Sequence, residues 1–182
     1  MRLDDLNALD REAAEQAFLR CCGSVRWARE MAARGPWPNL EALAEEADKI
    51  WRGLATVDHL QAFGAHPRIG EAQEAGRSEE AGRTGGTGRA EGPDDQSWSS
   101  QEQSRVAAAG HDVRKRLAAA NDDYQARFGF IFIVCATGKS ADELLLMVEE
   151  RLKHSRQDEL RIAAEEQRKI TQLRLGKLVS AI

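Results

Sequence analysis

Residues 39–54, with the sequence NLEALAEEADKIWRGL, decide the fold class. Apolar side chains recur in this stretch every three or four residues, which is the period of an α-helix with one buried face. Asn39 is a suitable N-cap, because its side chain can accept a hydrogen bond from the backbone of the first turn. The stretch therefore predicts an amphipathic helix packed on a core. Its apolar positions are Leu40, Leu43, Ala44, Ala47, Ile50, Trp51 and Leu54.

The same pattern extends on both sides of this helix. Asp10 can cap a helix that Gly23 ends, and Ser24 can cap a shorter one before the rigid break at residues 36–38. A further short helix follows at about residues 57–63. Four helices in about 65 residues, with no alternating apolar and polar run between them, predict an all-α domain.

Residues 71–97 have a different composition. They contain no apolar side chain larger than alanine and hold six of the fifteen glycines. Such a segment cannot bury enough surface to offset the entropy lost on ordering. We expect a flexible insertion within one domain spanning residues 1–182, because neither flank alone has a complete core.

Helical patterns return after the insertion. Ser99 with Glu102, and Ser140 with Glu143, match capping boxes that open two helices, and a last helix is expected from about Gln157 to Leu178. Between them, residues 128–136 (FGFIFIVCA) have the propensity of a buried strand. A single strand would lack a partner for its backbone, so a buried extended segment is the alternative. The sequence predicts an all-α single-domain bundle of roughly 8–10 helices.

Composition excludes several classes of partner and location. A net charge of −4 gives no reason to expect nucleic acid or an anionic membrane as a partner. The longest apolar run, residues 128–136, is shorter than the roughly 18 residues of a membrane span. The acidic first twenty residues do not resemble a secretory signal peptide. A cytoplasmic protein is expected.

No motif in the sequence indicates a metal or an organic cofactor. Cys21, Cys22 and Cys135 lack CxxC spacing and a neighbouring histidine, which favours small core residues over a zinc site. A phosphate-binding loop and a dinucleotide fingerprint are also missing. Any chemistry is therefore expected to use side chains alone.

His66 is the first candidate for such chemistry. It opens the pentapeptide HPRIG (residues 66–70), in which Pro67 stiffens the backbone and holds His66 away from helical geometry. Histidine has an unperturbed pKa near neutrality, which suits acid/base catalysis. From the pentapeptide alone, a surface turn that happens to contain histidine is the other interpretation.

Arg174 and Glu102 also allow two interpretations. On a helical wheel with Ile170 at zero, Arg174 falls at about +40°, inside an apolar arc that holds Leu173, Leu175 and Leu178. A buried guanidinium needs a partner, so Arg174 either pairs with an internal carboxylate or snorkels to the edge of the apolar face, or it acts as an anion or carbonyl clamp in a pocket. Glu102 is either a capping-box partner alone or also a site residue.

Four motifs in order resemble one family. They are His66-Pro67-Arg68-Ile69-Gly70, Ser99-x-x-Glu102-Gln103, the run from Phe128 to Ser140, and Lys169-Ile-x-x-Leu-Arg174-Leu175. Together they are similar to the 2-oxo-4-hydroxy-4-carboxy-5-ureidoimidazoline (OHCU) decarboxylases of uric acid breakdown. The resemblance runs from Leu6 to the last helix, and only the glycine-rich insertion departs from it.

This resemblance implies an all-α homodimer that converts OHCU to (S)-allantoin and CO2 without a metal or organic cofactor. It implies that His66 and Glu102 are the catalytic pair. It also implies that a further set of residues contacts the substrate, partly through backbone groups: Pro67, Ser99, Gln103, Ile133, Val134, Cys135, Ala136 and Arg174.

Two other functions are compatible with the same scaffold. One is a cofactor-free hydrolase or isomerase acting on a related ureide. The other is an inactive helical binding module. The intact set of polar residues argues against the inactive module, because unused polar groups are costly to keep in a pocket.

Overall fold

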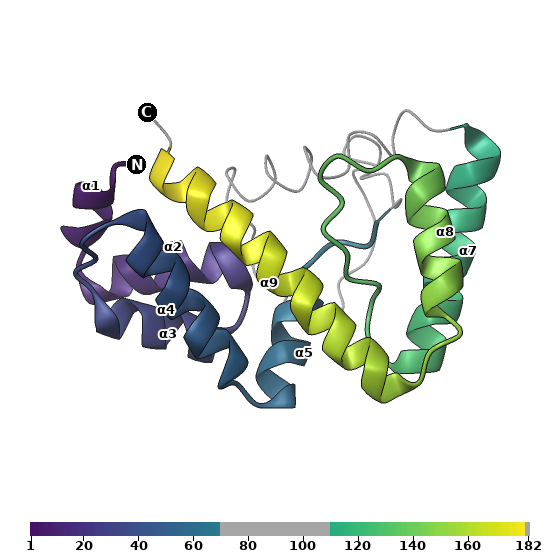
Figure 1. Cartoon of the computed structure of the whole chain (residues 1–182), viewed down its shortest axis with the longest axis horizontal. Helices are drawn as coiled ribbons and strands as arrows, with labels where there is room; N and C mark the ends of the chain where they lie inside the picture. The colour runs from purple at the N-terminus through teal and green to yellow at the C-terminus, as the bar shows by residue number, and fades with distance from the viewer. Residues whose placement is uncertain (70–109, 181–182) are drawn as a thin grey trace, which may run out of the picture.

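The computed structural model describes residues 1–69 and 110–180, and every regular element in these two ranges is a helix (Figure 1). This confirms the predicted all-α fold. The flexible insertion expected at residues 71–97, and the helix start expected at Ser99, lie outside the described residues. The helices are α1 (Leu3–Asn7), α2 (Arg11–Cys22), α3 (Val25–Arg34), α4 (Leu40–Arg52), α5 (Thr56–Gly64), α7 (His111–Phe128), α8 (Ala141–Arg151) and α9 (Arg156–Ser180).

The helices begin where the sequence places their caps. Side-chain oxygens of Asp10 and Asn39 accept hydrogen bonds from backbone N–H groups of their first turns, both at 2.8 Å. Ser24 and Ser140 do the same at 3.3 and 3.2 Å. These bonds satisfy donors that a helix cannot pair internally, so local sequence fixes the helix starts.

Helix α9 joins the two ends of the molecule. Figure 1 shows it running from the α7–α8 pair to the group formed by α1–α5. It packs against α2, α4, α5 and α7. The indole N–H of Trp51 in α4 donates to the carbonyl of Ala164 at 3.0 Å, and Arg168 pairs with Asp48 at 2.7 Å. The predicted last helix is confirmed, with bounds slightly wider than expected.

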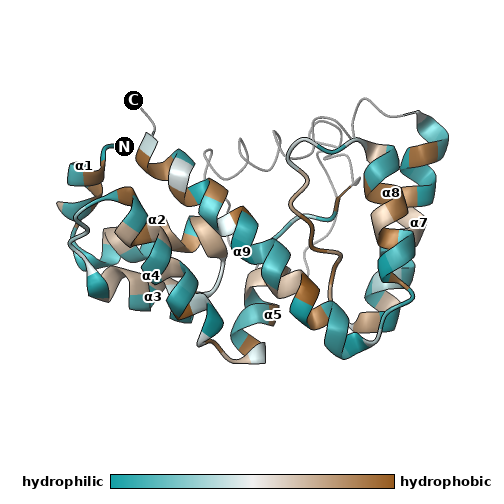
Figure 2. Ribbon diagram, viewed as in Figure 1, coloured by the Kyte–Doolittle hydropathy of each residue, from teal (hydrophilic) through white to brown (hydrophobic). Residues whose placement is uncertain are grey.

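Residues 129–140 connect α7 to α8 without forming a strand, so the extended segment was the correct alternative. The part of the segment that leads away from α7 is apolar (Figure 2), and Phe132 and Val134 are buried. Its backbone is held by side chains: Arg151 donates to the carbonyl of Ile133, and the N–H of Cys135 donates to Glu166, both at 2.7 Å. These two hydrogen bonds pair backbone groups that a partner strand would pair in a sheet.

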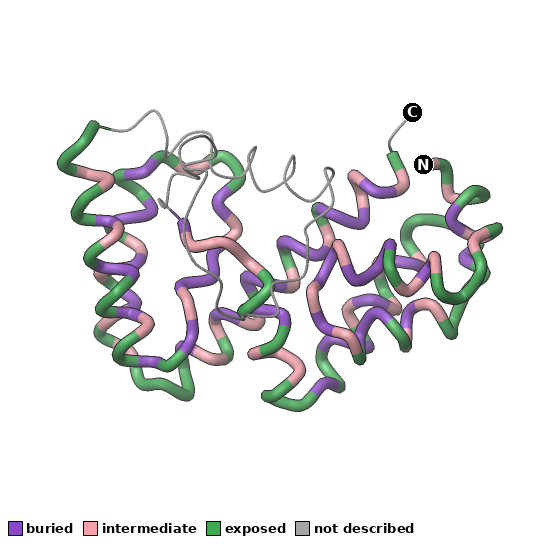
Figure 3. The backbone as a smooth tube through the Cα atoms, turned by 180° about the vertical axis from the view of Figure 1, so that it is seen from behind, coloured by how far each residue is buried: buried purple, intermediate pink, exposed green. Residues whose placement is uncertain are grey.

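Buried and exposed positions alternate along the helices, as amphipathic packing requires (Figure 3). Arg174 is buried, as the helical wheel predicts, with 8% of its surface exposed. Leu173 is 41% exposed, so the apolar arc of α9 is narrower than expected. Within residues 1–69 and 110–180, no helix is long and apolar enough to cross a membrane.

Gly23 lets the end of α2 approach the end of α5. Its φ of +81° lies in the left-handed region, and a Cβ at this position would lie 2.5 Å from the Cβ of Ala65. Only glycine fits both requirements. Because Ala65 immediately precedes His66, this contact helps to place the histidine.

Candidate active site

His66 lies directly after α5, where its N–H donates to the carbonyl of Phe63 at 3.1 Å. Its half-buried side chain faces a small cavity formed where three parts of the chain meet. The wall consists of His66, Pro67 and Ile69, then Phe132, Ile133, Val134 and Ala136, and finally Ile170 of α9.

A buried amide holds the imidazole. Nε2 of His66 lies 2.7 Å from Oε1 of Gln167, whose side chain is fully buried in α9. Loss of hydration and the positive charge of Arg174 together lower the pKa of His66 to about 3, although the Gln167 bond acts in the opposite direction. The imidazole is therefore neutral at physiological pH and can accept a proton.

The rest of the pentapeptide is anchored to α7. The side-chain amide of Asn121 donates to the carbonyl of Ile69 at 2.7 Å. Arg68 pairs with Asp122 at 2.6 Å and also donates to Gln125. Arg68, to which the sequence assigned no role, thus fixes the turn that carries His66.

Arg174 brings positive charge to the same region. It follows Gln167 on the buried face of α9, and its charge acts on both His66 and Cys22. Burial raises the pKa of the Cys22 thiol to about 12 despite that charge. Cys22 is therefore a protonated core thiol and not a nucleophile.

The segment after α7 contributes Phe132, Ile133, Val134 and Ala136 to the cavity wall. The carbonyl of Ile133 and the N–H of Cys135 point toward Arg151 and Glu166. In an extended chain, the backbone groups of the residue between them point to the other side. Val134 and Ala136 line the cavity, whereas Cys135 does not.

Arg151 is itself held by a second polar group, the Glu159 cluster, consisting of Tyr124, Arg151, His154 and Glu159. The carboxylate of Glu159, which is fully buried, accepts from Arg151 at 2.8 Å, from His154 at 2.7 Å and from the Tyr124 hydroxyl. Burial raises the pKa of Tyr124, so its phenol keeps the proton that it donates. The cluster fixes Arg151, and Arg151 fixes Ile133.

The structure brings together several of the predicted site residues. His66, Pro67, Ile133, Val134 and Ala136 line one cavity. Arg174 lies on the α9 face that carries Gln167, and Cys135 contributes its N–H to Glu166 instead of to the cavity. The predicted Ser99, Glu102 and Gln103 lie outside the described residues.

Sequence reasoning missed Gln167 and Thr171. On the wheel that places Arg174 at about +40°, these residues fall at about +60° and +100°, inside the same arc. Both are buried, at 0% and 4% exposure. Extending the wheel one turn toward the start of α9 reveals a polar row of Gln167, Thr171 and Arg174 on an otherwise apolar face.

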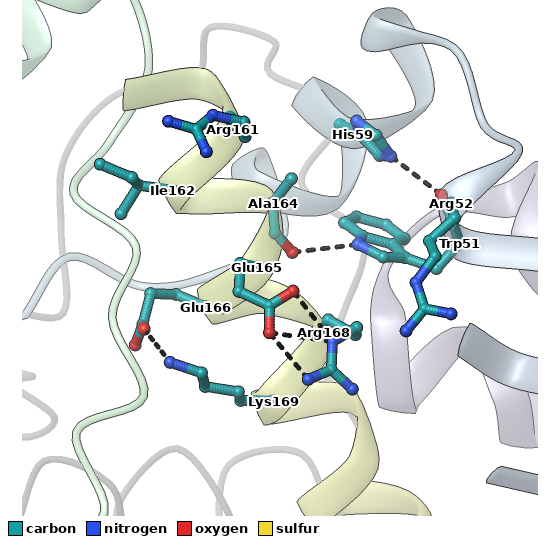
Figure 4. Close-up of a pocket in the computed structure, with 10 residues that line it drawn as sticks. All are labelled: Trp51, Arg52, His59, Arg161, Ile162, Ala164, Glu165, Glu166, Arg168 and Lys169. Atoms are coloured by element: carbon teal, nitrogen blue, oxygen red, sulfur yellow. Dashed lines mark hydrogen bonds and ion pairs between the residues drawn. The ribbon is translucent and has the colours of Figure 1, made fainter. Parts of the chain in front are cut away.

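A larger hollow of about 470 Å³ lies between the first half of α9 and the end of α4 (Figure 4). Its charged side chains pair with one another or with nearby residues. Glu165 pairs with Arg168 at 2.7 Å and Glu166 with Lys169 at 2.6 Å. Because these charges are already compensated, the described residues that line the hollow leave no charged group for a ligand.

Comparison with known proteins identifies relatives over most of the chain. A family model described as OHCU decarboxylase matches residues 7–176. The uric acid degradation bifunctional protein TTL of Arabidopsis thaliana is 34% identical over 93% of this chain, which spans only 48% of that relative. A 2-oxo-4-hydroxy-4-carboxy-5-ureidoimidazoline decarboxylase of Haloferax volcanii is 25% identical over 100% of this chain and 98% of its own length.

Solved structures share the fold. An OHCU decarboxylase crystallised in the presence of (S)-allantoin superposes with a TM-score of 0.71 at 32% identity, covering 90% of this chain and 96% of that one. An (S)-allantoin synthase superposes with a TM-score of 0.69 at 15% identity, over 99% of this chain and 54% of that one. The second similarity supports the fold alone.

Proposed function

The chain belongs to the OHCU decarboxylase family, and we propose that it catalyses the reaction for which the family is named. This carboxy-lyase reaction converts 2-oxo-4-hydroxy-4-carboxy-5-ureidoimidazoline to (S)-allantoin and CO2 in urate degradation. The observation that carries the proposal is the family match over residues 7–176. The half-buried, neutral His66 at a cavity agrees with it.

The substrate provides its own electron sink. Its carboxylate is attached to a carbon next to a ring C=N bond, so the electron pair released with CO2 can move into that bond. The ring nitrogen takes up a proton and an enol results. Protonation of the neighbouring carbon on one face, with loss of the hydroxyl proton, then gives (S)-allantoin. Overall, one proton is taken up for each CO2 released.

The protein has to orient the substrate and move protons. We assign the exchange of the hydroxyl or ring proton to His66, because a neutral imidazole can both accept and return a proton. Glu102 orients His66 or the substrate hydroxyl. Ser99 and Gln103 contact the substrate, as do Pro67 and the backbone of residues 133–136.

Arg174 is assigned to the oxygen where negative charge increases, on the ring carbonyl or the ureido group. A cation there stabilises the transition state more than the ground state. Holding the departing carboxylate instead would stabilise the ground state. Its placement beside His66 supports the first role.

The direct test uses freshly oxidised urate as substrate and circular dichroism to follow the chirality of the allantoin. Allantoin forms slowly without enzyme, so acceleration and enantiomeric excess are the criteria. We expect both with the wild-type chain. Racemic product at the uncatalysed rate would favour the inactive binding module, and consumption of a related ureide instead would favour the hydrolase or isomerase.

The same assay tests the catalytic pair. His66→Asn and Glu102→Gln should each lower kcat by at least about 100-fold, the usual scale of acid/base catalysis. His111→Asn is a matched control, because His111 is exposed at the start of α7. Near wild-type turnover in either variant of the pair would refute the assignment.

The homodimer and the cytoplasmic location form a separate part of the proposal and rest on the family resemblance. Light scattering on the purified chain should give the mass of two copies. A mass of one copy with full activity would refute the dimer without affecting the catalytic assignment. Fractionation of the source cells would test the location.

A further inference from the structure

The side-chain amide of Gln167 has one orientation that satisfies its neighbours. Its nitrogen lies 3.3 Å from Oγ1 of Thr171 and 3.5 Å from the carbonyl oxygen of Cys22. The Thr171 hydroxyl donates its own hydrogen to the backbone carbonyl of Gln167 at 3.0 Å, so toward the amide it can only accept. The backbone carbonyl of Cys22 is also an acceptor. The amide nitrogen therefore faces two acceptors, and the amide oxygen faces His66.

This orientation determines the tautomer of the histidine. Oε1 of Gln167 can only accept, so Nε2 of His66, at 2.7 Å, must carry the hydrogen. A neutral imidazole has a single N–H, and Nδ1 is then left with a lone pair. Because His66 lines the cavity, that lone pair is the proton acceptor available to a ligand.

We infer that Gln167 is a positioning residue that holds His66 as the Nε2–H tautomer and presents Nδ1 as the base of the reaction. Thr171 and the Cys22 carbonyl fix the amide, and the amide fixes the imidazole. The inference deepens the proposed function and rests on it for the role of Nδ1. The tautomer itself follows from hydrogen-bond geometry alone.

The choice of an amide over a carboxylate has a chemical consequence. A glutamate at position 167 would pair with the imidazolium and favour the protonated ring. Glutamine orients the ring as well but adds no charge. Among the described residues, the charge of Arg174 in α9 acts on His66 and disfavours its protonation. Arg174 thus favours the unprotonated base, and Gln167 opposes this only through a neutral hydrogen bond.

Nitrogen NMR on the full chain labelled with 15N-histidine tests the tautomer without reference to activity. The chain has four histidines, and the His66 signals are those lost in His66→Asn. In the wild type at pH 7, we expect a pyrrole-like shift for Nε2 and a pyridine-like shift for Nδ1 of His66. The reverse pattern, or an imidazolium, would overturn the inference.

Two variants of Gln167 separate positioning from packing. Gln167→Leu should give His66 a mixture of tautomers and leave its ring without a fixed orientation. We expect kcat to fall about 10–100-fold with little change in KM, because neither the wrong tautomer nor a misoriented ring can act as the base. Gln167→Glu should raise the pKa of His66 and move the acidic limb of the kcat–pH profile upward by at least about one unit. An unchanged His66 spectrum in Gln167→Leu, together with an unchanged pH profile in Gln167→Glu, would refute the positioning role. If the Leu variant does not fold, the pH titration of the His66 signals in the Glu variant decides.

Gln172→Leu is the matched control. Gln172 is also a glutamine of α9 that ties the helix to another element, donating to the carbonyl of Ala44 at 2.8 Å and to Asp48 at 2.5 Å. Its loss should leave the His66 spectrum and the pH profile unchanged. If the wild type shows the Nε2–H tautomer but no OHCU turnover, the proposed function fails while the tautomer assignment stands.

Discussion

Two polar clusters are buried against α9, and they differ in charge. The Glu159 cluster consists of an ion pair with a phenol and a histidine around a fully buried carboxylate. The Gln167 cluster, defined as His66, Gln167, Thr171 and the Cys22 carbonyl, is held by neutral hydrogen bonds. The first holds the segment after α7, and the second ends on a histidine that faces a cavity.

This difference separates the structural role of the Glu159 cluster from the catalytic role that we propose for His66. In the Glu159 cluster, the charges compensate one another, so the group holds its shape and has no charge left for a ligand. In the Gln167 cluster, a neutral acceptor orients His66 without protonating it. Among the hollows lined by residues 1–69 and 110–180, the one of about 470 Å³ is larger than the cavity at His66, but its charges are likewise paired.

Among the variants that test the difference between the two clusters, Glu159→Gln should have the largest effect. This change leaves the Arg151 guanidinium, 7% exposed, without its buried counter-charge. We expect the free energy of unfolding to fall by about 3–5 kcal/mol, the usual cost of removing one partner of a buried pair. Urea denaturation at pH 7 measures it.

Glu165→Gln is the control, since Glu165 is half-exposed and pairs with Arg168 on the surface of α9. We expect a loss of less than about 1 kcal/mol from it. Equal losses in the two variants would show that the Glu159 cluster has no special structural role.

Arg174→Lys tests the role that we propose for Arg174 in catalysis. A lysine keeps the charge but loses the planar fork of the guanidinium, so we expect kcat and kcat/KM to fall together by about tenfold or more. Steady-state kinetics with OHCU measures both constants. A higher KM with unchanged kcat would mean uniform substrate binding and would refute the assigned role.

The smallest expected effect is on acid stability. The pKa of His66 is lowered from 6.5 to about 3 in the folded chain, so between these pH values the unfolded chain binds more protons. The contribution of neutral His66 to stability is complete above about pH 6.5 and declines as the pH falls toward 3. His66→Asn removes this dependence.

We expect the wild type to lose about 1 kcal/mol more than His66→Asn when the pH is lowered from 7 to 5, a figure reduced from the full one-proton slope because the ring is half-buried. Urea denaturation at both pH values gives the difference. The exposed His111→Asn variant should behave like the wild type. Parallel losses in wild type and His66→Asn would contradict a neutral His66.

The positions of the helices could be predicted from the sequence, because helix caps and apolar periods are local features. Asp10, Ser24, Asn39 and Ser140 all cap the helices predicted for them. The segment at residues 128–136 was ambiguous, because strand propensity reports apolar, β-branched and aromatic content and not the presence of a partner strand. Its partners are Arg151 and Glu166, which only the tertiary structure reveals.

Only those features of the site that depend on a local sequence pattern could be predicted. The burial of Arg174 followed from the period of one helix. The contact of His66 with Gln167 joins residues 101 positions apart, and nothing local in the sequence indicates it. Arg68 likewise has its partners in α7, more than 50 positions away.

The position of α9 constrains the order in which the molecule can assemble. Its bonds to Trp51, His66 and Cys22 span 113, 101 and 145 positions, although α2–α5 can form early from local contacts. Contacts of such long sequence separation form late and slow the folding of small domains. During synthesis, the histidine therefore acquires its partner only after α9 has been made and has docked, so the site proposed for catalysis is among the last parts of the protein to mature.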